Sequence, residues 1–478
     1  MRASKAIVFA ISGLLPSATV FAQEAIVREL QLVAQFDLNG DKRLDANERQ
    51  SAREYLASHP ELRPPRRRSR VEPGKPGPVV PPTDFSASPG VPLYDLGTFR
   101  TVFLEFEIEG WERELADFHG TDVDIAATMV VDGRSYQDVG VHFRGHNSFL
   151  AVPEGSKRAL TLSPDFGDSS QRLFGYRGLH LLNAYGDPTF LRGVLFLQIC
   201  REYIPAPEAN FVRVVIEGES WGVYVNQQRF DTDFLRDHFG TTKGTRWKSF
   251  NNAPGGGLSY LGEDISAYRE SYEIKSKDDP AAWAALVELC RVLHQTPPEQ
   301  LPEALDPIMD VDSVLRLLAL DNTLMNGDGY WEDGSDFNLY LDTEGRFHTV
   351  PYDVNEAFRP FGRRGVELDP FAMSEDPNKA LLGKLLAAPT LRTQYLEYIR
   401  HIAENWLDWN RLGPLVEKHR SLIAAEVARD TRKLYSTEEF TVGVLGEGTG
   451  TPSINTLRGF VEGRRVFLLS HPEIRKVP

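Results

Sequence analysis

The hydrophobic periodicity changes along the chain, and this change limits the folds that the chain can adopt. After Leu93, segments such as "TVFLEFEI" and "FVRVVIEGESWGVYVNQQ" alternate with a period of two, which is typical of strands joined by glycine-containing turns. Helical spacing then dominates, and longer helices are predicted over residues 281–293, 312–325, 378–386 and much of 390–434. A strand-rich first half followed by a helix-rich second half predicts one α+β domain of two lobes, residues 93–478.

The charge balance excludes one broad class of function. The formal net charge is −15, whereas a general nucleic-acid binder needs a surplus of Lys and Arg to bind phosphate. One basic run, "RPPRRRSR", interrupts this pattern inside the Pro- and Arg-rich segment 59–92, which predicts an extended linker. The run is interpreted as solvated linker, with an anionic surface contact or a protease-sensitive point as the alternatives.

The first 22 residues have the pattern of a secretory signal. Arg2 and Lys5 supply a positive start, "AIVFAISGLL" is a short apolar region, and small residues precede Ala22. Cleavage near Ala22 predicts an exported protein in the periplasm, at the cell surface or in the medium. A membrane anchor is the alternative, although no later segment reaches the roughly 18 apolar residues of a membrane span.

Export permits disulfide bonds, but the chain has 2 cysteines. Cys200 and Cys290 both lie in apolar, helix-like stretches, so two buried free thiols are favoured and a bridge between them stays open. Neither a CxxC nor an HExxH motif occurs, which argues against a zinc site.

Residues 23–58 have the organisation of a small helical EF-hand segment. Apolar residues at near-helical spacing between Ile26 and Phe36 precede a twelve-residue loop, and a second helical stretch follows it. The loop offers oxygen ligands for Ca²⁺ at the expected positions: Asp37, Asn39, Asp41, the carbonyl of Arg43, Asp45 and Glu48. Lys42 replaces the usual glycine at the sixth position, which predicts weakened calcium affinity. A solvated acidic turn is the alternative.

A β-hairpin in the second half joins two carboxylates. A helix is followed by the loop "NGDGYWEDGS" with Asp328, the strand "DFNLYL", the turn "DTEG" and the strand "FHTVPY", which ends at Asp353. Kinases use the same order of parts, a catalytic-loop Asp, a metal-binding Asn, a hairpin and a second Asp on magnesium. Asp353 therefore marks either a metal site or a plain turn at the end of a strand.

With this hairpin, four motifs make the chain resemble the spore-coat-protein-H (CotH) family of atypical kinases from Leu93 to about Ile474. They are "VGVHFRGHNS", "SKRALTL", "ESWGVYVN" and the series "NGD…FNLYL…VPYDVN". The resemblance implies a two-lobed, atypical protein-kinase-like domain behind the EF-hand segment.

The resemblance also implies roles for particular residues. Asp353 would bind the Mg²⁺ or Mn²⁺ that bridges the ATP phosphates, with Asn338 as a second ligand. Asp328 would orient the acceptor hydroxyl, and Lys157 would reach the α- and β-phosphates. The loop over the phosphates would contain Arg144, Gly145, Asn147 and Ser148.

Two departures from the family pattern bear on activity. "SKR" leaves open whether Lys157 or Arg158 meets the phosphate, and Arg is not equivalent to a point-charge lysine. Gln228 stands where many members carry a glutamate, so it can hydrogen-bond the lysine without neutralising it.

The function predicted from the sequence is an exported, metal-dependent kinase that transfers the γ-phosphoryl group of ATP to a protein Ser/Thr hydroxyl, with a Ca²⁺-binding EF-hand. The partner would be a protein substrate such as a surface or coat protein. The alternative is a catalytically weakened, calcium-binding scaffold or surface interaction protein. A hydrolase that uses the Asp pair is disfavoured because no nucleophile–base pair is visible.

Overall fold

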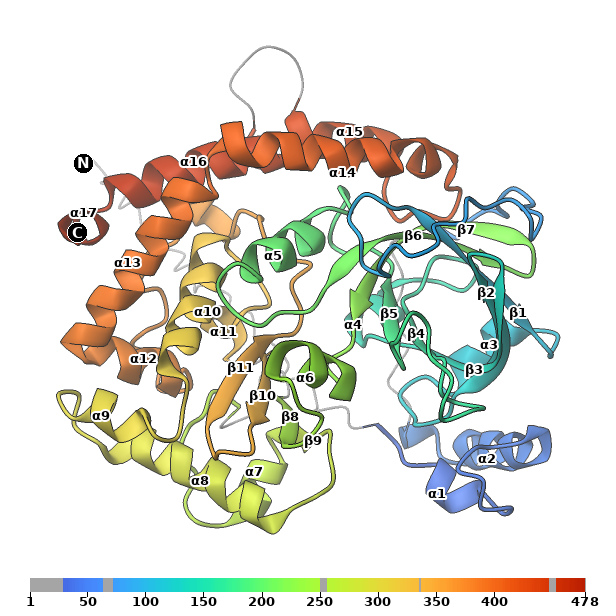
Figure 1. Cartoon of the computed structure of the whole chain (residues 1–478), viewed down its shortest axis with the longest axis horizontal. Coiled ribbons are helices and arrows are strands. Elements are labelled where there is room, and N and C mark those ends of the chain that lie inside the picture. Colours follow the sequence, from blue (N-terminus) through green and yellow to red (C-terminus); the bar gives the residue numbers. More distant parts are fainter. Residues whose placement is uncertain (1–28, 63–71, 250–255, 335–336, 447–452, 478) are drawn as a thin grey trace, which may run out of the picture.

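A computed structural model of the chain describes residues 29–62, 72–249, 256–334, 337–446 and 453–477. The signal segment 1–22 and the arginine run at 63–70 lie outside these residues. The structure combines β-sheets with many helices, so the predicted α+β class is confirmed (Figure 1). Within the described residues, no helix is both long and apolar enough to cross a membrane. Cys200 and Cys290 are both free and buried, as favoured from the sequence.

The first half of the chain closes into a seven-stranded barrel with the order β1-β2-β3-β4-β5-β7-β6. Neighbouring strands are antiparallel except for β1 and β6, which close the barrel as a parallel pair. The strands are β1 (Arg100–Phe106), β2 (Ile125–Val131), β3 (Arg134–Phe143), β4 (Leu160–Ser163), β5 (Leu179–Leu182), β6 (Ala209–Ile216) and β7 (Glu219–Gln228). Two short helices lie between them, α3 (Trp111–Asp117) and α4 (Asn147–Ala151). The sequence predicted strands here, but closure of the barrel was not anticipated.

The second half is built around a four-stranded antiparallel sheet with the order β11-β10-β8-β9. Its strands are β8 (Thr245–Ser249), β9 (Tyr272–Ile274), β10 (Phe337–Leu341) and β11 (Phe347–Pro351). The predicted hairpin is therefore confirmed, because β10 and β11 pair with Phe337 opposite Pro351.

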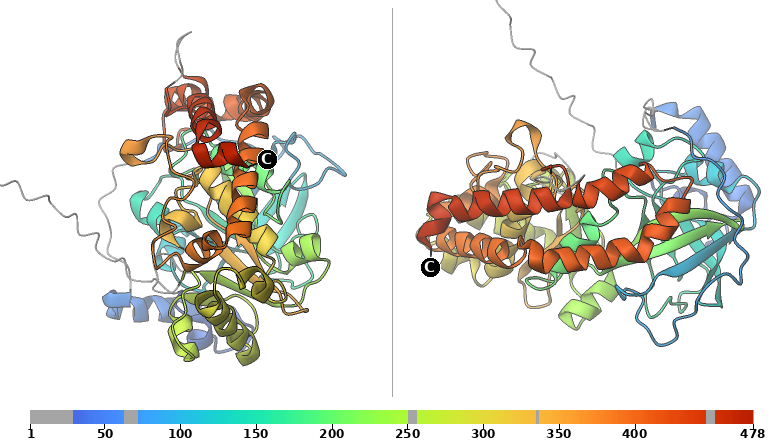
Figure 2. Two further views of the ribbon diagram at one scale, coloured as in Figure 1. Left: turned by 90° about the vertical axis from the view of Figure 1, so that its left-hand side faces the viewer. Right: turned by 90° about the horizontal axis from the view of Figure 1, so that it is seen from above.

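Helices surround this sheet, and two of them also reach the barrel. The helices are α5 (Arg192–Cys200), α6 (Thr232–Phe239), α7 (Ile265–Arg269), α8 (Pro280–Gln295), α9 (Leu301–Leu305), α10 (Val311–Thr323), α11 (Tyr330–Asp333), α12 (Ala380–Ala387), α13 (Pro389–Asn405), α14 (Trp409–Arg429), α15 (Thr437–Leu445), α16 (Leu457–Ser470) and α17 (Pro472–Lys476). Two 3-10 turns occur at Pro60–Leu62 and Gly362–Arg364. Helix α14 contacts β7 of the barrel and runs beside α15 and α16 along one side of the molecule (Figures 1 and 2).

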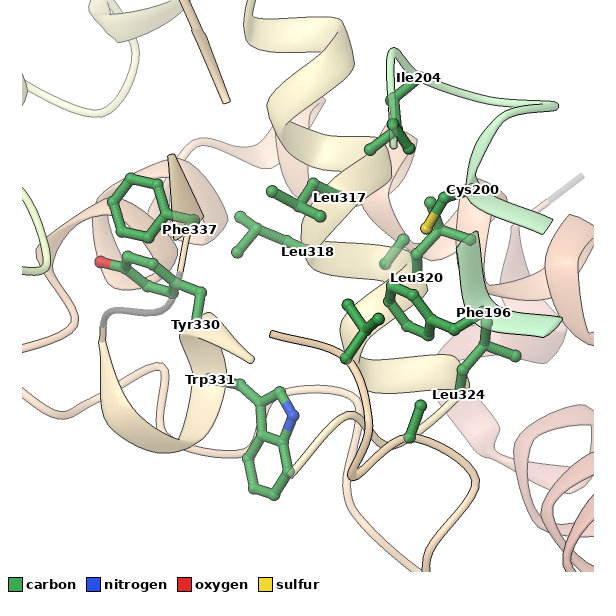
Figure 3. Packing of buried hydrophobic residues seen from close by; sticks show 14 of the residues in the cluster. Phe196, Cys200, Ile204, Leu317, Leu318, Leu320, Leu324, Tyr330, Trp331 and Phe337 are labelled. Carbon is green, nitrogen blue, oxygen red and sulfur yellow. The ribbon is translucent and has the colours of Figure 1, made fainter. Parts of the chain in front are cut away.

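Two large hydrophobic clusters hold the two parts. One fills the barrel, and the other spans the helices and includes the contact of α5 with α10, where Phe196 and Cys200 face Leu317 and Leu320 (Figure 3). Trp331 belongs to the same cluster and packs beside the loop that carries Asp328. The apolar core thus supports the predicted catalytic loop from below.

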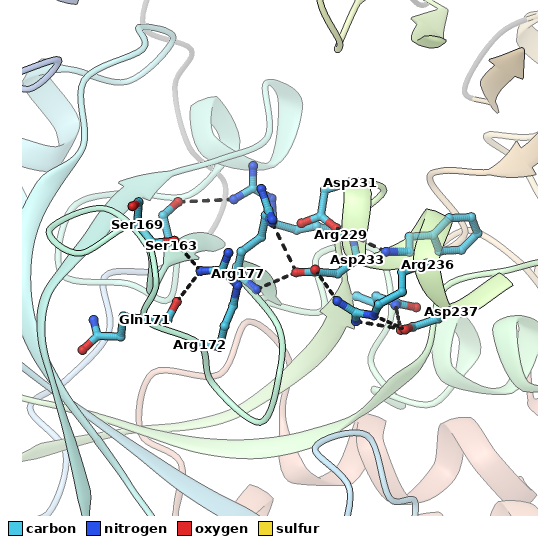
Figure 4. A network of polar contacts seen from close by, with 12 residues as sticks. Ser163, Ser169, Gln171, Arg172, Arg177, Arg229, Asp231, Asp233, Arg236 and Asp237 are labelled. Atoms are coloured by element: carbon cyan, nitrogen blue, oxygen red, sulfur yellow. Dashed lines mark hydrogen bonds and ion pairs between the residues drawn. The ribbon is translucent and has the colours of Figure 1, made fainter. Parts of the chain in front are cut away.

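A polar network joins the barrel to α6, the first helix after β7 (Figure 4). Asp233 accepts the backbone N–H of Arg177 at 2.7 Å and the guanidinium of Arg236 at 2.6 Å. Arg229 donates to Ser163 on β4 at 3.2 Å. These contacts fix the direction in which the chain leaves the barrel.

The N-terminal segment packs on the barrel instead of standing apart from it. Helix α1 (Val33–Phe36) is shorter than the stripe from Ile26 predicts, because Leu30 pairs with Thr121 as an isolated parallel bridge. Helix α2 (Ala46–Ser58) forms as expected and begins with a capping box of Asp45 and Glu48.

The described part of the Pro-rich segment from residue 72 onward is attached to the barrel. Val80 N–H donates to the carbonyl of Gly218 at 2.8 Å, and Ser220 N–H donates to that of Pro78 at 2.9 Å. The described part of this segment therefore follows the turn between β6 and β7.

Candidate active site

A cavity of about 260 Å³ collects residues from the barrel, the four-stranded sheet and the loops of the helical part. It is lined by Arg144, Gly145, His146, Asn147, Ser148, Ala159, Leu182, Asn183, Ala184, Tyr185, Asp187, Phe190, Gly193, Val225, Gln227, Lys248, Asp328, Tyr352, Asp353, Val354, Asn355 and Glu356. Of the predicted site, the loop 144–148 and both carboxylates, Asp328 and Asp353, therefore meet in one place, although they are far apart in the sequence.

A single amide joins the two carboxylate-bearing segments. Asn326 Nδ2 donates to the backbone carbonyl of Asp353 at 3.0 Å, and Asn326 Oδ1 accepts the N–H of Asp328 at 3.4 Å. The loop and the strand end are thus tied together directly beside the cavity. This contact fixes the spacing of the two carboxylates through the backbone.

Asp321 supports the loop from beneath, and the sequence analysis missed it. Its carboxylate accepts Asn326 Nδ2 and the N–H of Tyr330, each at 3.2 Å. Burial raises the pKa of Asp321 to about 7, because no cation compensates the lost hydration. Gly329 approaches so closely that an added Cβ would lie 2.7 Å from Asp321 Cγ. The available signal was one carboxylate on the otherwise apolar stripe "LLALDNT".

Two cations that line the cavity converge on one phenol, that of Tyr352. Arg144 Nη2 and Lys248 Nζ each donate to Tyr352 Oη at 3.1 Å. Burial raises the pKa of Tyr352, but the charges of Lys248 and Arg144 outweigh it, so the pKa is lowered overall. The cavity therefore contains both acidic groups, Asp328 and Asp353, and basic groups, Arg144 and Lys248.

Lys157 and Arg158 do not line this cavity. Lys157 is fully buried inside the barrel wall, where its Nζ forms an ion pair with Asp430 and donates to the carbonyl of Val223 at 2.8 Å. Burial lowers the pKa of Lys157. Arg158 is also buried and donates to the carbonyl of Val152. The cation that the structure places in the cavity is Lys248 of β8, which the sequence analysis did not select.

Gln228 also points away from the cavity, whereas its neighbour Gln227 lines it. Gln228 is buried, donates to Asp237 at 3.0 Å and accepts the N–H of Glu208 at 3.1 Å. Successive side chains of a strand point to opposite faces, so a shift of one residue reverses the side chain. The glutamine that faces the cavity is thus Gln227.

Asn338 lies beside the cavity without lining it. It is buried on β10, directly opposite Lys248 of β8, and its Nδ2 makes no hydrogen bond within the described residues. No group of three or more Asp, Glu, His or Cys side chains in that part of the chain is arranged to hold a metal ion. Mg²⁺ commonly needs only one or two carboxylates together with substrate phosphates and water. Asp328 and Asp353 fit that requirement.

The predicted calcium loop, residues 37–48, lies on the surface between α1 and α2. Asp37 accepts the N–H groups of Gly40 at 2.7 Å and Lys42 at 2.8 Å, and Glu48 accepts that of Leu38 at 2.7 Å. Lys42 has φ +65°, the left-handed conformation that glycine usually supplies at this position. The carboxylates of this loop bind backbone amides.

The fold and this cavity define an α+β protein with acidic and basic groups gathered where barrel and helical part meet. The family described as CotH kinase protein matches residues 141–468, more than half of the chain, so the chain belongs to this family. The family predicted from the four motifs is therefore confirmed.

Named relatives are similar at low identity. Invasin CotH7 of Rhizopus delemar is 23% identical over 265 residues, which cover 51% of this chain and 42% of the relative. Spore coat protein homolog 1 of the same organism is 22% identical over 262 residues, covering 51% and 41%. The Inner spore coat protein H-like protein of Bacillus subtilis is 24% identical over 306 residues, covering 63% and 82%. The chain spans about two fifths of the length of the two Rhizopus relatives.

Proposed function

We propose that this chain is a metal-dependent atypical kinase that transfers the γ-phosphoryl group of ATP to a Ser/Thr hydroxyl of a protein. The observation that carries the proposal is the cavity that Asp328 and Asp353, tied by Asn326, line together with Arg144 and Lys248. Phosphoryl transfer depends mainly on positioning and on neutralising charge, and this arrangement provides groups for both.

In this mechanism Asp353 would hold Mg²⁺ or Mn²⁺ together with substrate phosphates and water, and the bound ion would neutralise phosphate charge. Asn338, expected as a second ligand, lies outside the cavity lining. Arg144 and Lys248 bind phosphate oxygens and take the role expected of Lys157. Asp328 orients the acceptor hydroxyl and accepts its proton. The hydroxyl oxygen forms the new bond to the γ-phosphorus, the bond to the β,γ-bridging oxygen breaks, and ADP leaves with that electron pair.

We also propose that the loop from Asp37 to Glu48 binds Ca²⁺ and that the protein is exported. Six ligand positions and the left-handed Lys42 support the calcium site. The pattern of residues 1–22 supports export. The relatives' printed names, an invasin and spore coat proteins, favour a protein substrate at a cell surface or coat.

A second candidate is a nucleotide-binding scaffold with weakened catalysis. It is favoured by the burial of Lys157 against Asp430 and by the neutral amide of Gln227 in the cavity, where a carboxylate could otherwise orient a cation. The two candidates differ in turnover and not in binding.

The test combines binding with transfer. Thermal unfolding of the mature protein is measured with ATP and Mg²⁺ or Mn²⁺, and radiolabelled phosphate transfer from γ-labelled ATP to casein and myelin basic protein is followed in parallel. Asp353→Asn removes a charge at the cavity, and Asp306→Asn, at an exposed aspartate after α9, is the matched control.

We expect metal-dependent stabilisation by ATP that disappears in Asp353→Asn and persists in Asp306→Asn. Transfer that Asp328→Asn abolishes supports the kinase, whereas binding without transfer supports the scaffold. Absence of any ATP effect on the unmodified protein contradicts both.

A further inference from the structure

The segment between α3 and β2, residues 118–124, contacts the N-terminal segment on one side. Leu30 N–H donates to the carbonyl of Gly120 at 2.9 Å, and Asp122 N–H donates back to the carbonyl of Leu30 at 3.0 Å. The carboxylate of Asp122 accepts the N–H groups of Leu32 at 2.7 Å and Val33 at 3.1 Å. A negative charge at the first turn of α1 satisfies helix donors that otherwise lack partners. The start of the N-terminal segment is therefore bound to residues 120–122.

The same segment contacts the cavity loop through His119. His119 Nε2 donates to the carbonyl of Gly145 at 2.7 Å, and its ring stacks on Phe149 with centroids 3.6 Å apart and planes 6° apart. A carbonyl only accepts, so Nε2 carries the hydrogen. Burial lowers the pKa of His119 to about 4, so the ring is neutral at ordinary pH.

The carbonyl that accepts this hydrogen bond belongs to Gly145, whose backbone has a left-handed conformation. Gly145 has φ +82°, and an added Cβ would lie 2.3 Å from Ser148 Oγ. Glycine has no intrinsic preference that would hold it in this conformation, so neighbouring contacts must do so. A second contact lies nearby, where His142 Nδ1 and Asp124 Oδ1 are 2.5 Å apart, two residues before Arg144. Residues 119–124 thus contact both the end of β3 and the loop that follows it.

We propose that His119 is a positioning residue for the 144–148 loop and that docking of the N-terminal segment, through Asp122, sets the affinity of the cavity for nucleotide. The proposal rests on the proposed nucleotide site. Its physical basis is preorganisation, because a loop that is already held in its binding conformation loses less freedom when ligand binds. The N-terminal segment would then act on the site without contacting the ligand.

The test uses the full mature chain with ATP and Mg²⁺ in titration calorimetry. His119→Ala removes the donor and the stacked ring, whereas His119→Gln keeps an N–H donor of similar reach. His294→Ala, at an exposed histidine of α8, is the matched control. We expect His119→Ala to raise the Kd about five- to tenfold, as for the loss of one hydrogen bond. His119→Gln restores most of the affinity, and His294→Ala changes nothing.

Hydrogen exchange measured without ligand tests the positioning role of His119 independently of the proposed nucleotide site. Amide hydrogen exchange of residues 144–149 is expected to accelerate in His119→Ala and, through the longer route, in Asp122→Asn. Asp122→Asn combined with His119→Ala should be less than additive if the two residues act in one chain of contacts.

Unchanged exchange in both variants overturns the proposal, whether or not ATP binds. Faster exchange with no ATP binding by the unmodified protein contradicts the nucleotide site and leaves the positioning role supported. Should His119→Ala fail to fold, Asp122→Asn decides the question with the same two measurements.

Discussion

Lys157 and Lys248 have opposite roles in this structure, and substitution of each by methionine separates them. Lys157 is fully buried, and its charge is balanced by Asp430. In Lys157→Met the carboxylate keeps the N–H groups of Val223 at 3.3 Å and Arg432 at 2.9 Å but loses its counter-charge. Removing one partner of a buried ion pair costs about 3–5 kcal/mol of the free energy of unfolding.

This cost translates into a measurable shift of the melting temperature. An unfolding entropy of about 2.1 cal/mol/K per residue gives roughly 1 kcal/mol/K for a chain of 478 residues. Lys157→Met should therefore melt about 3–5 °C lower. Lys157→Met combined with Asp430→Asn should regain part of that loss, because the uncompensated charge is gone.

Lys248→Met should behave in the opposite way. The side chain is partly exposed and donates to Tyr352 in the cavity, so its loss should change the melting temperature little. The Kd for ATP with Mg²⁺ should rise by about tenfold or more, as expected for a charged hydrogen bond. Calorimetric unfolding and ATP titration of both variants test the reasoning. A Lys157→Met protein with unchanged melting temperature and lost ATP binding would refute it.

Two further predictions concern pH and calcium. Burial lowers the pKa of His348, but its hydrogen bonds with Asp310 and Asp342 outweigh this, so the pKa lies above the usual 6.5. The stabilisation from His348 is complete below about pH 6.5 and is lost as pH rises through the folded pKa. In His348→Gln, the free energy of unfolding measured with a chemical denaturant should therefore fall less between pH 6 and 8. Lys42→Gly removes a side chain at φ +65° and a charge beside the loop, so calcium affinity should rise about tenfold in titration calorimetry, while Lys42→Ala should gain less.

The sequence predicted the parts of this site that depend on local order. The hairpin β10–β11 is continuous in sequence, and its turn and alternating residues specify the pairing that ends at Pro351, two residues before Asp353. Arg144–Ser148 was selected because the motif "VGVHFRGHNS" resembles a turn of the CotH family, and this motif is also continuous in sequence. Both segments line the cavity.

The missed residues depend on contacts between distant segments. Lys248 enters the cavity because β8 pairs with β10, with Lys248 opposite Asn338, 90 positions away in the sequence. Lys157 does not line the cavity because it pairs with Asp430, which reaches the barrel wall from the end of α14. The pairing of β7 with β5 determines which face of β7 points to the cavity. Gln227 lies on that face, and Gln228 lies on the other. Neither propensity nor periodicity contains that information.

In the N-terminal segment, contacts between distant residues also determine where a helix begins. Residues from Ile26 to Phe36 have near-helical spacing, yet Leu30 pairs with Thr121, and the helix begins only where Asp122 satisfies its first amides. Helical propensity is worth a few tenths of a kcal/mol per residue, so a few tertiary contacts override it. The parallel pairing of β1 with β6 that closes the barrel is equally non-local.

The chain as a whole is acidic, whereas its cavity brings two cations together. A formal charge of −15 excludes general binding to nucleic acid, because that function requires phosphate contacts over a wide surface. A single nucleotide needs only a few cations at one place, and Arg144 and Lys248 meet there although they come from different parts of the fold. His180, on the neighbouring strand β5, has a pKa far below its usual value through burial and the nearby charges of Arg144 and Arg229. The charges of Arg144 and Arg229 add to the effect of burial there, and a concentration of positive charge favours phosphate.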